Sequence, residues 1–278
     1  MIVERPFCIT NGSGDSIRGD LRLPASARPE GLIIVCHGFT AHKDWGPFPF
    51  FGRSFAEGGF ASIVFNFSHN GIGANFRKFT EIERFSRNTV GKELEDLRAV
   101  LDAAFGGKIE GYAGTGPVGV VGHSRGAGIA ILAASVDARI RAVAAWSTIA
   151  TFHRYTPHQR SEWERTGSLP LSLKSYRTKL RLGIGLLRDL EANRERYDLT
   201  AAVKRLRVPL LLVHGAEDVS VKLAEPTMLY EASDKTNTEM VVIEHAGHAF
   251  GARHPFDEKN AVVKHLADLT AEWFHRHL

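Results

Sequence analysis

Residues 118–126 read Val-Gly-Val-Val-Gly-His-Ser-Arg-Gly and lead directly into the alanine-rich stretch 127–135. The short apolar run 118–121 predicts a buried strand, and the alanine-rich stretch predicts a helix. Between them stands the pattern G-x-S-x-G, which is typical of a nucleophile elbow, a sharp turn that presents a serine hydroxyl above a sheet. The two glycines leave space where a side chain would collide with neighbouring backbone. We therefore expect Ser124 to act as a nucleophile.

A serine nucleophile needs a general base and a group that orients this base. Asp218 follows the apolar run 208–213 in the loop Gly-Ala-Glu-Asp, and His248 follows the apolar run 240–243 in the stretch Ala-Gly-His-Ala. Both positions lie in loops after predicted buried strands. Ser124, Asp218 and His248 are thus the predicted catalytic residues, with Glu217 and His245 as the nearest alternatives.

Four motifs together resemble the α/β-hydrolase superfamily from about residue 20 to the end of the chain. They are the elbow at Ser124, the His-Gly-Phe triplet 37–39, the Gly-x-x-Asp loop 215–218 and the Gly-His pair 247–248. The chain order serine, acid, histidine is also the order of this superfamily. The resemblance implies a single α/β-hydrolase domain over residues 1–278, with a mostly parallel central sheet flanked by helices.

Within the superfamily, residues 37–41 and 65–71 are most similar to bacterial carboxylesterases of the cinnamoyl and feruloyl esterase type, although Asn70 stands where those enzymes usually show Gly-His-Gly. The resemblance implies a serine esterase that cleaves small to medium acyl or aryl esters through an acyl-enzyme. Backbone N–H groups of Phe39 and Arg125 would form the oxyanion hole. We expect His37 and His123 to support the oxyanion loop and the elbow by hydrogen bonding rather than by proton transfer.

Two other functions compete with ester hydrolysis. The same triad supports cleavage of C–C bonds, thioesters or peptides, because function resides in the pocket rather than in the fold. A catalytically silent binding protein on a hydrolase scaffold is the alternative from a different class.

The coarse pattern of elements alternates between short apolar runs and amphipathic stretches, which predicts a parallel sheet covered by helices. Residues 3–9 and 17–23 predict an antiparallel hairpin at the sheet edge. Helix 89–105 carries an apolar stripe, with Glu93, Asp96 and Arg98 on its polar side. A second amphipathic helix is predicted at residues 258–277. Buried strands are predicted at residues 32–36, 61–67, 118–121, 140–146, 208–213 and 240–243.

Roughly 60 residues separate the strands ending at Trp146 and beginning at Val208, more than a crossover helix needs. The resemblance implies that residues 150–200 form a lid over the active site. Residues 168–172 and 175–182 are predicted to pair as a hairpin, followed by a helix over 184–196. Six side chains would line an apolar acyl or aryl pocket, or else only dock the insertion onto the body: Tyr155, Trp163, Leu169, Leu171, Tyr176 and Leu186.

Length and composition agree with a single enzyme of this kind. Hydrophobic residues make up 44% of the 278 residues, no apolar stretch is long enough for a membrane span, and the first residues lack a signal-peptide core, so we expect a cytoplasmic location. Cys36 lies in an apolar run, which favours a small packing role over a disulfide.

The net charge of +4 is scattered rather than clustered, so nucleic acid is not an expected partner. The Gly-Ile-Gly triplet 71–73 lacks the third glycine of a dinucleotide fingerprint, and no P-loop is present. His245, His248 and His254 lack partners at metal-ligand spacing. We expect no cofactor, no metal and a small-molecule ester as the partner, and the sequence leaves the oligomeric state open.

Overall fold

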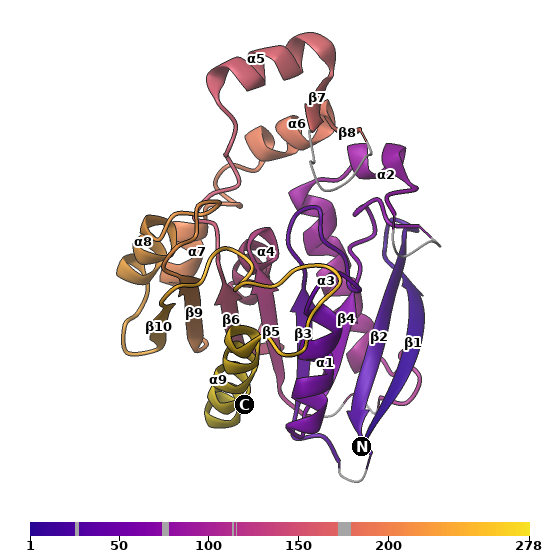
Figure 1. The fold of residues 1–278 in the computed structure, drawn as a ribbon. Helices are drawn as coiled ribbons and strands as arrows, with labels where there is room; N and C mark the ends of the chain where they lie inside the picture. The colour runs from indigo at the N-terminus through magenta and orange to yellow at the C-terminus, as the bar shows by residue number, and fades with distance from the viewer. Residues whose placement is uncertain (26–27, 74–77, 113, 115, 172–178) are drawn as a thin grey trace.

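The computed structural model describes residues 1–25, 28–73, 78–112, 114, 116–171 and 179–278. Within these residues one large sheet carries eight strands, with β1 and β2 antiparallel at one edge and parallel neighbours from β4 onward (Figure 1). The predicted α/β-hydrolase fold is therefore confirmed. The strands in sheet order are β1 (Ile2–Thr10), β2 (Ser16–Pro24), β4 (Ala61–Phe65), β3 (Leu32–Cys36), β5 (Val118–His123), β6 (Ile140–Trp146), β9 (Leu210–Gly215) and β10 (Thr238–Ile243).

Several strand ends differ from the sequence prediction by a few residues, and two of them have a local reason. Strand β4 ends at Phe65 rather than Phe67, and the backbone N–H of Phe67 turns to Nε2 of His37 at 3.3 Å. Strand β9 begins at Leu210, because Pro209 has no N–H to donate to a neighbouring strand. Cys36 is fully buried in β3 with a free thiol, as expected.

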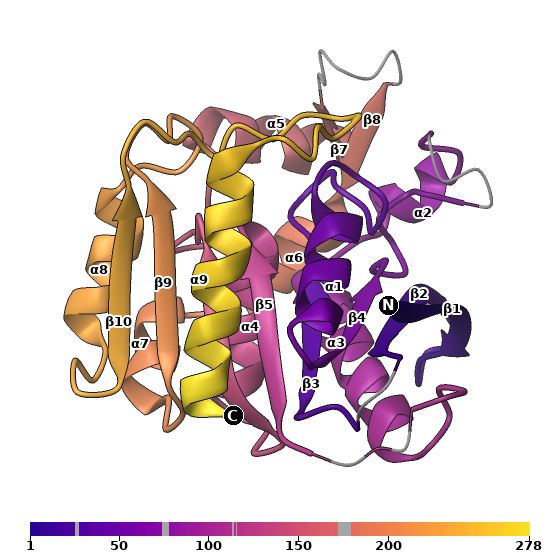
Figure 2. The same cartoon turned by 60° about the horizontal axis from the view of Figure 1, so that its bottom comes forward.

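Helices cover both faces of the large sheet, as predicted. Helices α1 (Phe48–Glu57) and α9 (Ala261–His277) pack on one face, with α9 crossing in front of the central strands in Figure 2. Phe51 of α1 lies 4.5 Å from the Trp146 ring. The opposite face is covered by α3 (Val90–Phe105), α4 (Arg125–Ala134), α7 (Leu199–Arg205) and α8 (Ala224–Ala232).

Side-chain caps set the start of the two long amphipathic helices. The Thr89 hydroxyl accepts from the backbone N–H of Lys92 and begins α3. The Asn260 side chain accepts from the N–H of Val263, and α9 begins at Ala261, three residues later than the predicted start at Glu258. Each cap satisfies a backbone donor that has no partner inside the helix.

The polar side of α3 is not the solvated face that its sequence predicts. Glu93 and Asp96 are 4% and 0% exposed, whereas the Arg98 side chain is 77% exposed. The prediction was wrong for both carboxylates because each has a buried hydrogen-bond partner from another element, which periodicity along one helix does not reveal.

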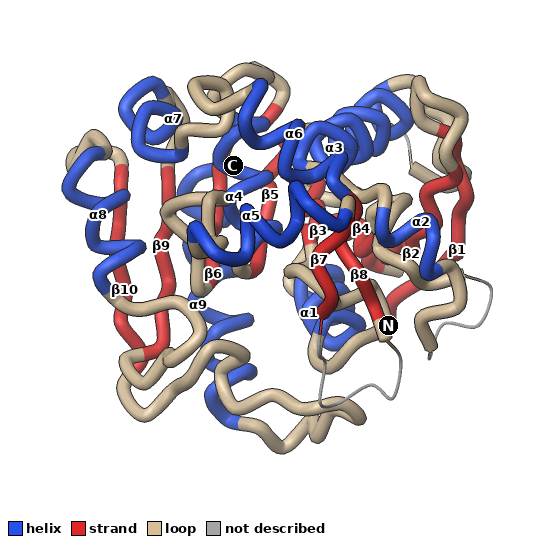
Figure 3. Tube along the Cα trace, turned by 90° about the horizontal axis from the view of Figure 1, so that it is seen from above, coloured by secondary structure: helices blue, strands red, loops and turns tan. Residues whose placement is uncertain are grey.

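The long insertion stands above the carboxyl ends of the parallel strands, where β5 and β6 terminate (Figures 1 and 3). It contains α5 (Pro157–Thr166), an antiparallel pair of β7 (Ser168–Leu171) and β8 (Leu180–Gly183), and α6 (Ile184–Ala192). The short helix α2 (Ile82–Ser86) packs beside β8. Residues 172–178, which include part of the predicted hairpin, lie outside the described residues.

Both helices of the insertion differ from the prediction. Helix α6 ends at Ala192 rather than 196, and Asn193 follows it with its side chain bonded to the carbonyl of Asp189. Helix α5 was not predicted, although Thr156 and Gln159 form a reciprocal capping box at its start.

Candidate active site

Ser124 stands alone between β5 and α4, at the turn that the sequence predicts. Its φ of 55° and ψ of −116° place a non-glycine residue in a strained backbone conformation. A Cβ on Gly122 would lie 2.4 Å from Cα of Ala127, and a Cβ on Gly126 would lie 2.4 Å from the carbonyl oxygen of His37. Only glycine fits at both positions, so the two glycines hold the elbow tight against the neighbouring strand and helix.

The imidazole of His248 is bonded to the Asp218 carboxylate. Nδ1 of His248 lies 2.7 Å from Oδ2 of Asp218. The other oxygen, Oδ1, accepts from the backbone N–H groups of Ser220 and Val221 at 2.8 and 2.9 Å. Because an ionised carboxylate only accepts hydrogen bonds, Nδ1 of His248 carries the proton and Nε2 is left as the basic nitrogen.

The backbone of His248 is hydrogen-bonded to His123, which precedes Ser124, and to Ser147, which follows β6. Its carbonyl oxygen accepts from Nε2 of His123 at 2.9 Å and from Oγ of Ser147 at 3.0 Å. The rings of His123 and His248 are 4.9 Å apart between centroids. Burial lowers the pKa of His123 to about 3, so this ring is neutral. His123 therefore supports the site by hydrogen bonding, as the sequence analysis expects.

The loop 37–40 lies directly against the elbow. A Cβ on Gly38 would lie 3.0 Å from Nδ1 of His123 and 3.4 Å from Cβ of Ser124. Nδ1 of His37 bonds the carbonyl oxygen of Gly38 at 2.9 Å, while its Nε2 accepts from the Phe67 N–H. Burial lowers the pKa of His37 to about 4, and the neutral ring fixes the loop that carries Phe39.

The N-terminus of α4 lies beside the loop 37–40 and presents backbone N–H groups there. Arg125 is the first residue of α4, so its backbone N–H is among those that find no partner within the helix. The helix dipole adds partial positive charge there. Together with the adjacent loop 37–40, this end of the helix is suited to hold a negatively charged oxygen.

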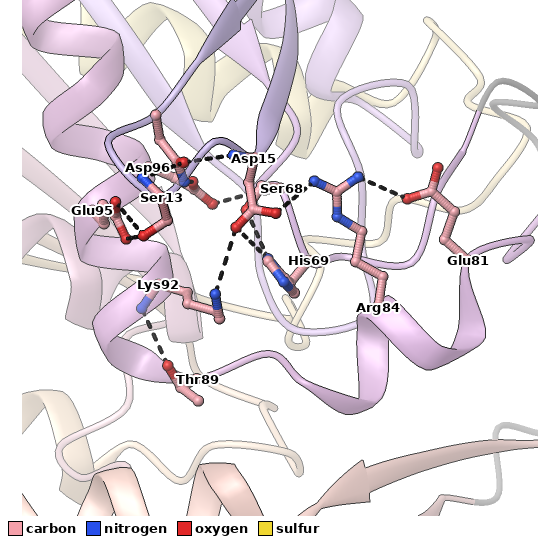
Figure 4. A network of polar contacts seen from close by, with 11 residues as sticks. Ser13, Asp15, Ser68, His69, Glu81, Arg84, Thr89, Lys92, Glu95 and Asp96 are labelled. Atoms are coloured by element: carbon pink, nitrogen blue, oxygen red, sulfur yellow. Dashed lines mark hydrogen bonds and ion pairs between the residues drawn. The ribbon is translucent and has the colours of Figure 1, made fainter.

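Asp96 anchors the loop that follows β4. Its carboxylate accepts from the backbone N–H of Ser68 at 2.7 Å and from Nδ2 of Asn11 at 2.8 Å. Figure 4 shows Asp96 bonded to Ser68, with Asp15 beside it between Lys92 and Arg84. Burial raises the pKa of Asp96 to about 7. This network fixes residues 66–68, one of which bonds His37.

The side chain of Arg125 forms a buried ion pair that the sequence analysis missed. Nε of Arg125 donates to Oε2 of Glu93 at 2.7 Å, and Nδ2 of Asn88 donates to Oε1 at 2.7 Å. The guanidinium carbon lies 5.7 Å from the Phe39 ring centroid and 5.5 Å from that of Phe152. A charged arginine inside the elbow was the sequence feature that could have indicated a buried ion pair. No local pattern identifies its partner, Glu93, which lies 32 residues away in the chain.

The alternative acid and base lie at the surface. Glu217 and His245 pair with each other at 3.2 Å, with side chains 64% and 90% exposed. Neither is among the contacts that join His248, His123 and the elbow.

The predicted pocket residues divide into two groups. Trp163, Leu169 and Leu186 are buried in the apolar core that joins the insertion to the body. Tyr155 and Leu171 are partly buried against this core, and the Tyr155 ring meets Trp163 edge-on at 4.9 Å. Tyr176 lies outside the described residues.

The described residues offer neither a metal cluster nor a membrane-spanning helix. In that part of the chain no cluster of three or more His, Cys, Asp or Glu side chains is arranged to bind a metal ion. None of the helices described there combines the length and apolarity that crossing a bilayer requires.

Comparison with known proteins agrees with this architecture. The model of the alpha/beta hydrolase family matches residues 33–262. The chain therefore belongs to the alpha/beta hydrolase family, and the resemblance inferred from its motifs is confirmed. It is also 23% identical over 288 aligned positions to an uncharacterised 31.7 kDa protein from the traX-finO intergenic region of Escherichia coli, covering 92% of this chain and 94% of that protein.

Solved structures share the fold at low sequence identity. Est1E from Butyrivibrio proteoclasticus, solved with ferulic acid bound, has a TM-score of 0.71 at 20% identity over 98% of both chains. An esterase from Pyrococcus furiosus has a TM-score of 0.65 at 19% identity, covering 99% of this chain and 91% of its own. The α/β hydrolase GrgF from Penicillium has a TM-score of 0.74 at 18% identity over 99% of both chains.

Proposed function

We propose that the protein is a serine hydrolase of carboxylic esters that acts on small to medium acyl or aryl esters. The observation that carries this proposal is the 2.7 Å hydrogen bond between His248 and Asp218, on a histidine whose backbone is bonded to His123 beside Ser124. A nucleophile, a base and an orienting acid then occupy the three required roles.

The reaction would proceed through an acyl-enzyme. Nε2 of His248 takes the proton from Oγ of Ser124 as this oxygen attacks the ester carbonyl, while Asp218 stabilises the imidazolium. The backbone N–H groups of Phe39 and Arg125 hold the negatively charged oxygen of the tetrahedral intermediate. His248 then protonates the leaving alcohol, and water, deprotonated by the same histidine, releases the acid and restores Ser124.

We also propose that residues 150–200 act as a lid and supply the acyl side of the pocket. The insertion rises above the edge of the sheet at which Ser124 lies (Figure 1). Phe152, at its beginning, contacts the guanidinium of Arg125. The partly buried Tyr155 and Leu171 are the side chains that a substrate would contact, whereas the deeply buried Trp163, Leu169 and Leu186 hold the insertion in place.

A fluorophosphonate probe tests the catalytic assignment directly. It should label the wild-type protein at Ser124, which mass spectrometry of the labelled peptide would establish. Ser124→Ala and Ser124→Gly are matched controls, and the glycine variant fits the positive φ at this position without strain. Both should lose labelling and about 10⁶-fold in turnover while keeping the wild-type circular dichroism spectrum.

A substrate panel then separates the possible reactions. We expect hydrolysis of p-nitrophenyl and hydroxycinnamoyl esters, with thioesters, peptides and C–C substrates turned over more slowly. Faster turnover of one of these other classes would reassign the reaction. An unlabelled Ser124 with no turnover of any class would leave a binding protein on a hydrolase scaffold.

A further inference from the structure

The two oxygens of the buried Glu93 carboxylate are taken by different side chains. Arg125 donates to one oxygen through Nε, and Asn88 donates to the other through Nδ2. Arginine commonly grips a carboxylate with two parallel N–H groups. Asn88 bonds the second oxygen, and the Nη2 group of Arg125 makes no hydrogen bond to Glu93 among the residues that the structure describes.

Two complementary polar atoms remain beside this carboxylate. Among the residues that the structure describes, Nη2 of Arg125 and Oδ1 of Asn88 are buried and have no hydrogen-bond partner. Both residues are deeply buried, with exposures of 8% and 4%. The orientation of the Asn88 amide follows from chemistry, since only its NH₂ group bonds a carboxylate. The pair therefore offers one donor and one acceptor.

The location of the pair connects it with the acyl part of a substrate. The backbone N–H of Arg125 is one of the two proposed oxyanion donors. Its guanidinium carbon lies 5.7 Å from the ring centroid of Phe39, which carries the other donor, and 5.5 Å from that of Phe152 of the insertion. The guanidinium carbon of Arg125 is joined to the residue's Cα through three methylene groups and Nε, which separate it from the backbone N–H. A group that meets the pair would thus be remote from the ester carbonyl.

We propose that Arg125 and Asn88 recognise a hydroxyl group at the far end of the acyl part of the substrate, an inference that rests on the proposed esterase function. The hydroxyl oxygen accepts from Nη2 of Arg125, and its hydrogen is donated to Oδ1 of Asn88. A hydroxyl satisfies both atoms because it is at once donor and acceptor. A substrate carboxylate does not satisfy both atoms, because it has no hydrogen to donate to Oδ1 of Asn88. It also adds a second negative charge beside Glu93, which already balances the charge of Arg125.

Matched triplets of methyl esters test this recognition in the wild-type protein. Each triplet consists of an ω-hydroxy, an ω-methoxy and an unsubstituted alkanoate in a chain-length series, with para-substituted phenylalkanoates as a rigid second series. At the chain length that reacts fastest, kcat/KM for the hydroxy ester should exceed that for the unsubstituted ester by at least about tenfold. A site that hydrogen-bonds a hydroxyl group discriminates against a substrate that lacks it. The methoxy ester, which accepts but does not donate, should fall between them.

Two variants assign the preference to the pair. In Asn88→Leu the Nη2 group is free to close on Glu93, and in Glu93→Gln/Arg125→Met no guanidinium remains, so both should lose the hydroxy preference. The readout is the ratio between two esters within one variant, which a general loss of activity does not change. As a further measurement, the hydroxy acid should inhibit the wild-type protein more strongly than the unsubstituted acid.

The outcomes distinguish a failure of hydroxyl recognition from a failure of the proposed esterase function. Equal kcat/KM values for the three esters of every triplet would overturn hydroxyl recognition, and so would a hydroxy preference that persists in both variants. In either case hydrolysis of the unsubstituted esters would leave the esterase assignment in place. No hydrolysis of any ester and no fluorophosphonate labelling of Ser124 overturns both.

Discussion

Nε2 of His123 donates a 2.9 Å hydrogen bond to the backbone carbonyl of His248, a residue 125 positions further along the chain. The bond joins the residue before the proposed nucleophile to the proposed base. It ties the backbone of the loop that carries His248 to the end of β5, next to Ser124.

We predict that His123→Phe lowers kcat by about 10- to 100-fold with a smaller change in KM, because a displacement of about 1 Å in a catalytic group has effects of this size. The ring remains packed, but the donor is lost and Ser147 alone bonds the His248 carbonyl. Steady-state kinetics on p-nitrophenyl acetate measures the effect. His265→Gln, at an exposed position, is the control, and an unchanged kcat in His123→Phe would show that the bond has no role in catalysis.

Variants at the two adjacent acids should differ sharply in activity. Asp218→Asn should lower kcat by about 10⁴-fold, because it presents the wrong partner to Nδ1 of His248. Glu217→Gln should remain close to wild type, since the Glu217 side chain is 64% exposed and pairs with the exposed His245. His248→Ala should equal Ser124→Ala in severity. An inactive Glu217→Gln beside an active Asp218→Asn would reverse the assignment.

Breaking the buried pair of Arg125 and Glu93 should destabilise the protein strongly. Either Arg125→Ala or Glu93→Gln should lower the free energy of unfolding by about 3–5 kcal/mol, because one charge is left buried without its partner. The double variant Glu93→Gln/Arg125→Met should be more stable than either single variant. Urea unfolding gives these values, and Arg165→Ala, which removes an exposed pair with Glu162, should cost less than about 1 kcal/mol. Additive losses in the double variant would argue against direct coupling.

Trimming the partly buried side chains of the insertion should change substrate preference more than chemistry. Tyr155→Ala and Leu171→Ala should raise KM for octanoyl and hydroxycinnamoyl esters by roughly tenfold, the usual size for lost pocket contacts. Acetyl esters, which do not reach the insertion, should be affected much less. Val219→Ala, at a 91% exposed position, serves as the control. Proportional losses on all three esters would give the insertion a structural role only.

Buried histidines should make stability depend on pH. Burial lowers the pKa of His37, His42 and His69 to about 4 and that of His123 to about 3. Between these values and about 6.5 the unfolded chain binds more protons than the folded one, so the free energy of unfolding falls as pH falls through this window, by about 1.4 kcal/mol per pH unit for each group. Burial raises the pKa of Asp96 to about 7, so below this value the folded chain binds more protons at this group than the unfolded chain does. The contribution of Asp96 to the free energy of unfolding therefore rises as pH falls, opposite to that of the histidines.

Two variants check the sign of this dependence by urea unfolding between pH 5 and 6.5. His42→Phe removes one depressed histidine and should flatten the dependence. Asp96→Asn removes the opposing carboxyl and should make it steeper. A steeper dependence in His42→Phe would contradict the assignment of a neutral buried ring.

Much of the fold and the candidate triad is predictable because the signals are local. A short apolar run bounded by turn residues specifies a buried strand wherever it lies in the sheet. Glycines at positions 122 and 126 are required by contacts within a few residues of Ser124 and by the adjoining strand. The loops after β9 and β10 follow strands that are parallel neighbours, so Asp218 and His248 emerge at the same edge of the sheet.

Other features depended on packing between distant segments. The periodicity of α3 assigns Glu93 and Asp96 to a polar face, but Arg125 approaches from α4 and Asn11 from the β1–β2 turn, and both carboxylates become buried. Pairing of this kind depends on which elements pack together. The sequence around a side chain does not identify a partner from a distant segment.

By itself, then, the amino-acid sequence determined the strands, the elbow at Ser124 and the chain order of the candidate triad, since hydrophobic patterning and turn chemistry act over short stretches. Only the tertiary structure decided which donors and acceptors are satisfied. His123 bonds the His248 carbonyl, and Glu93 bonds both Arg125 and Asn88. Within the part of the chain that the structure describes, Nη2 of Arg125 and Oδ1 of Asn88 have no hydrogen-bond partner. These relationships arise because buried polar groups must find partners within hydrogen-bond distance, and folding alone brings such partners together.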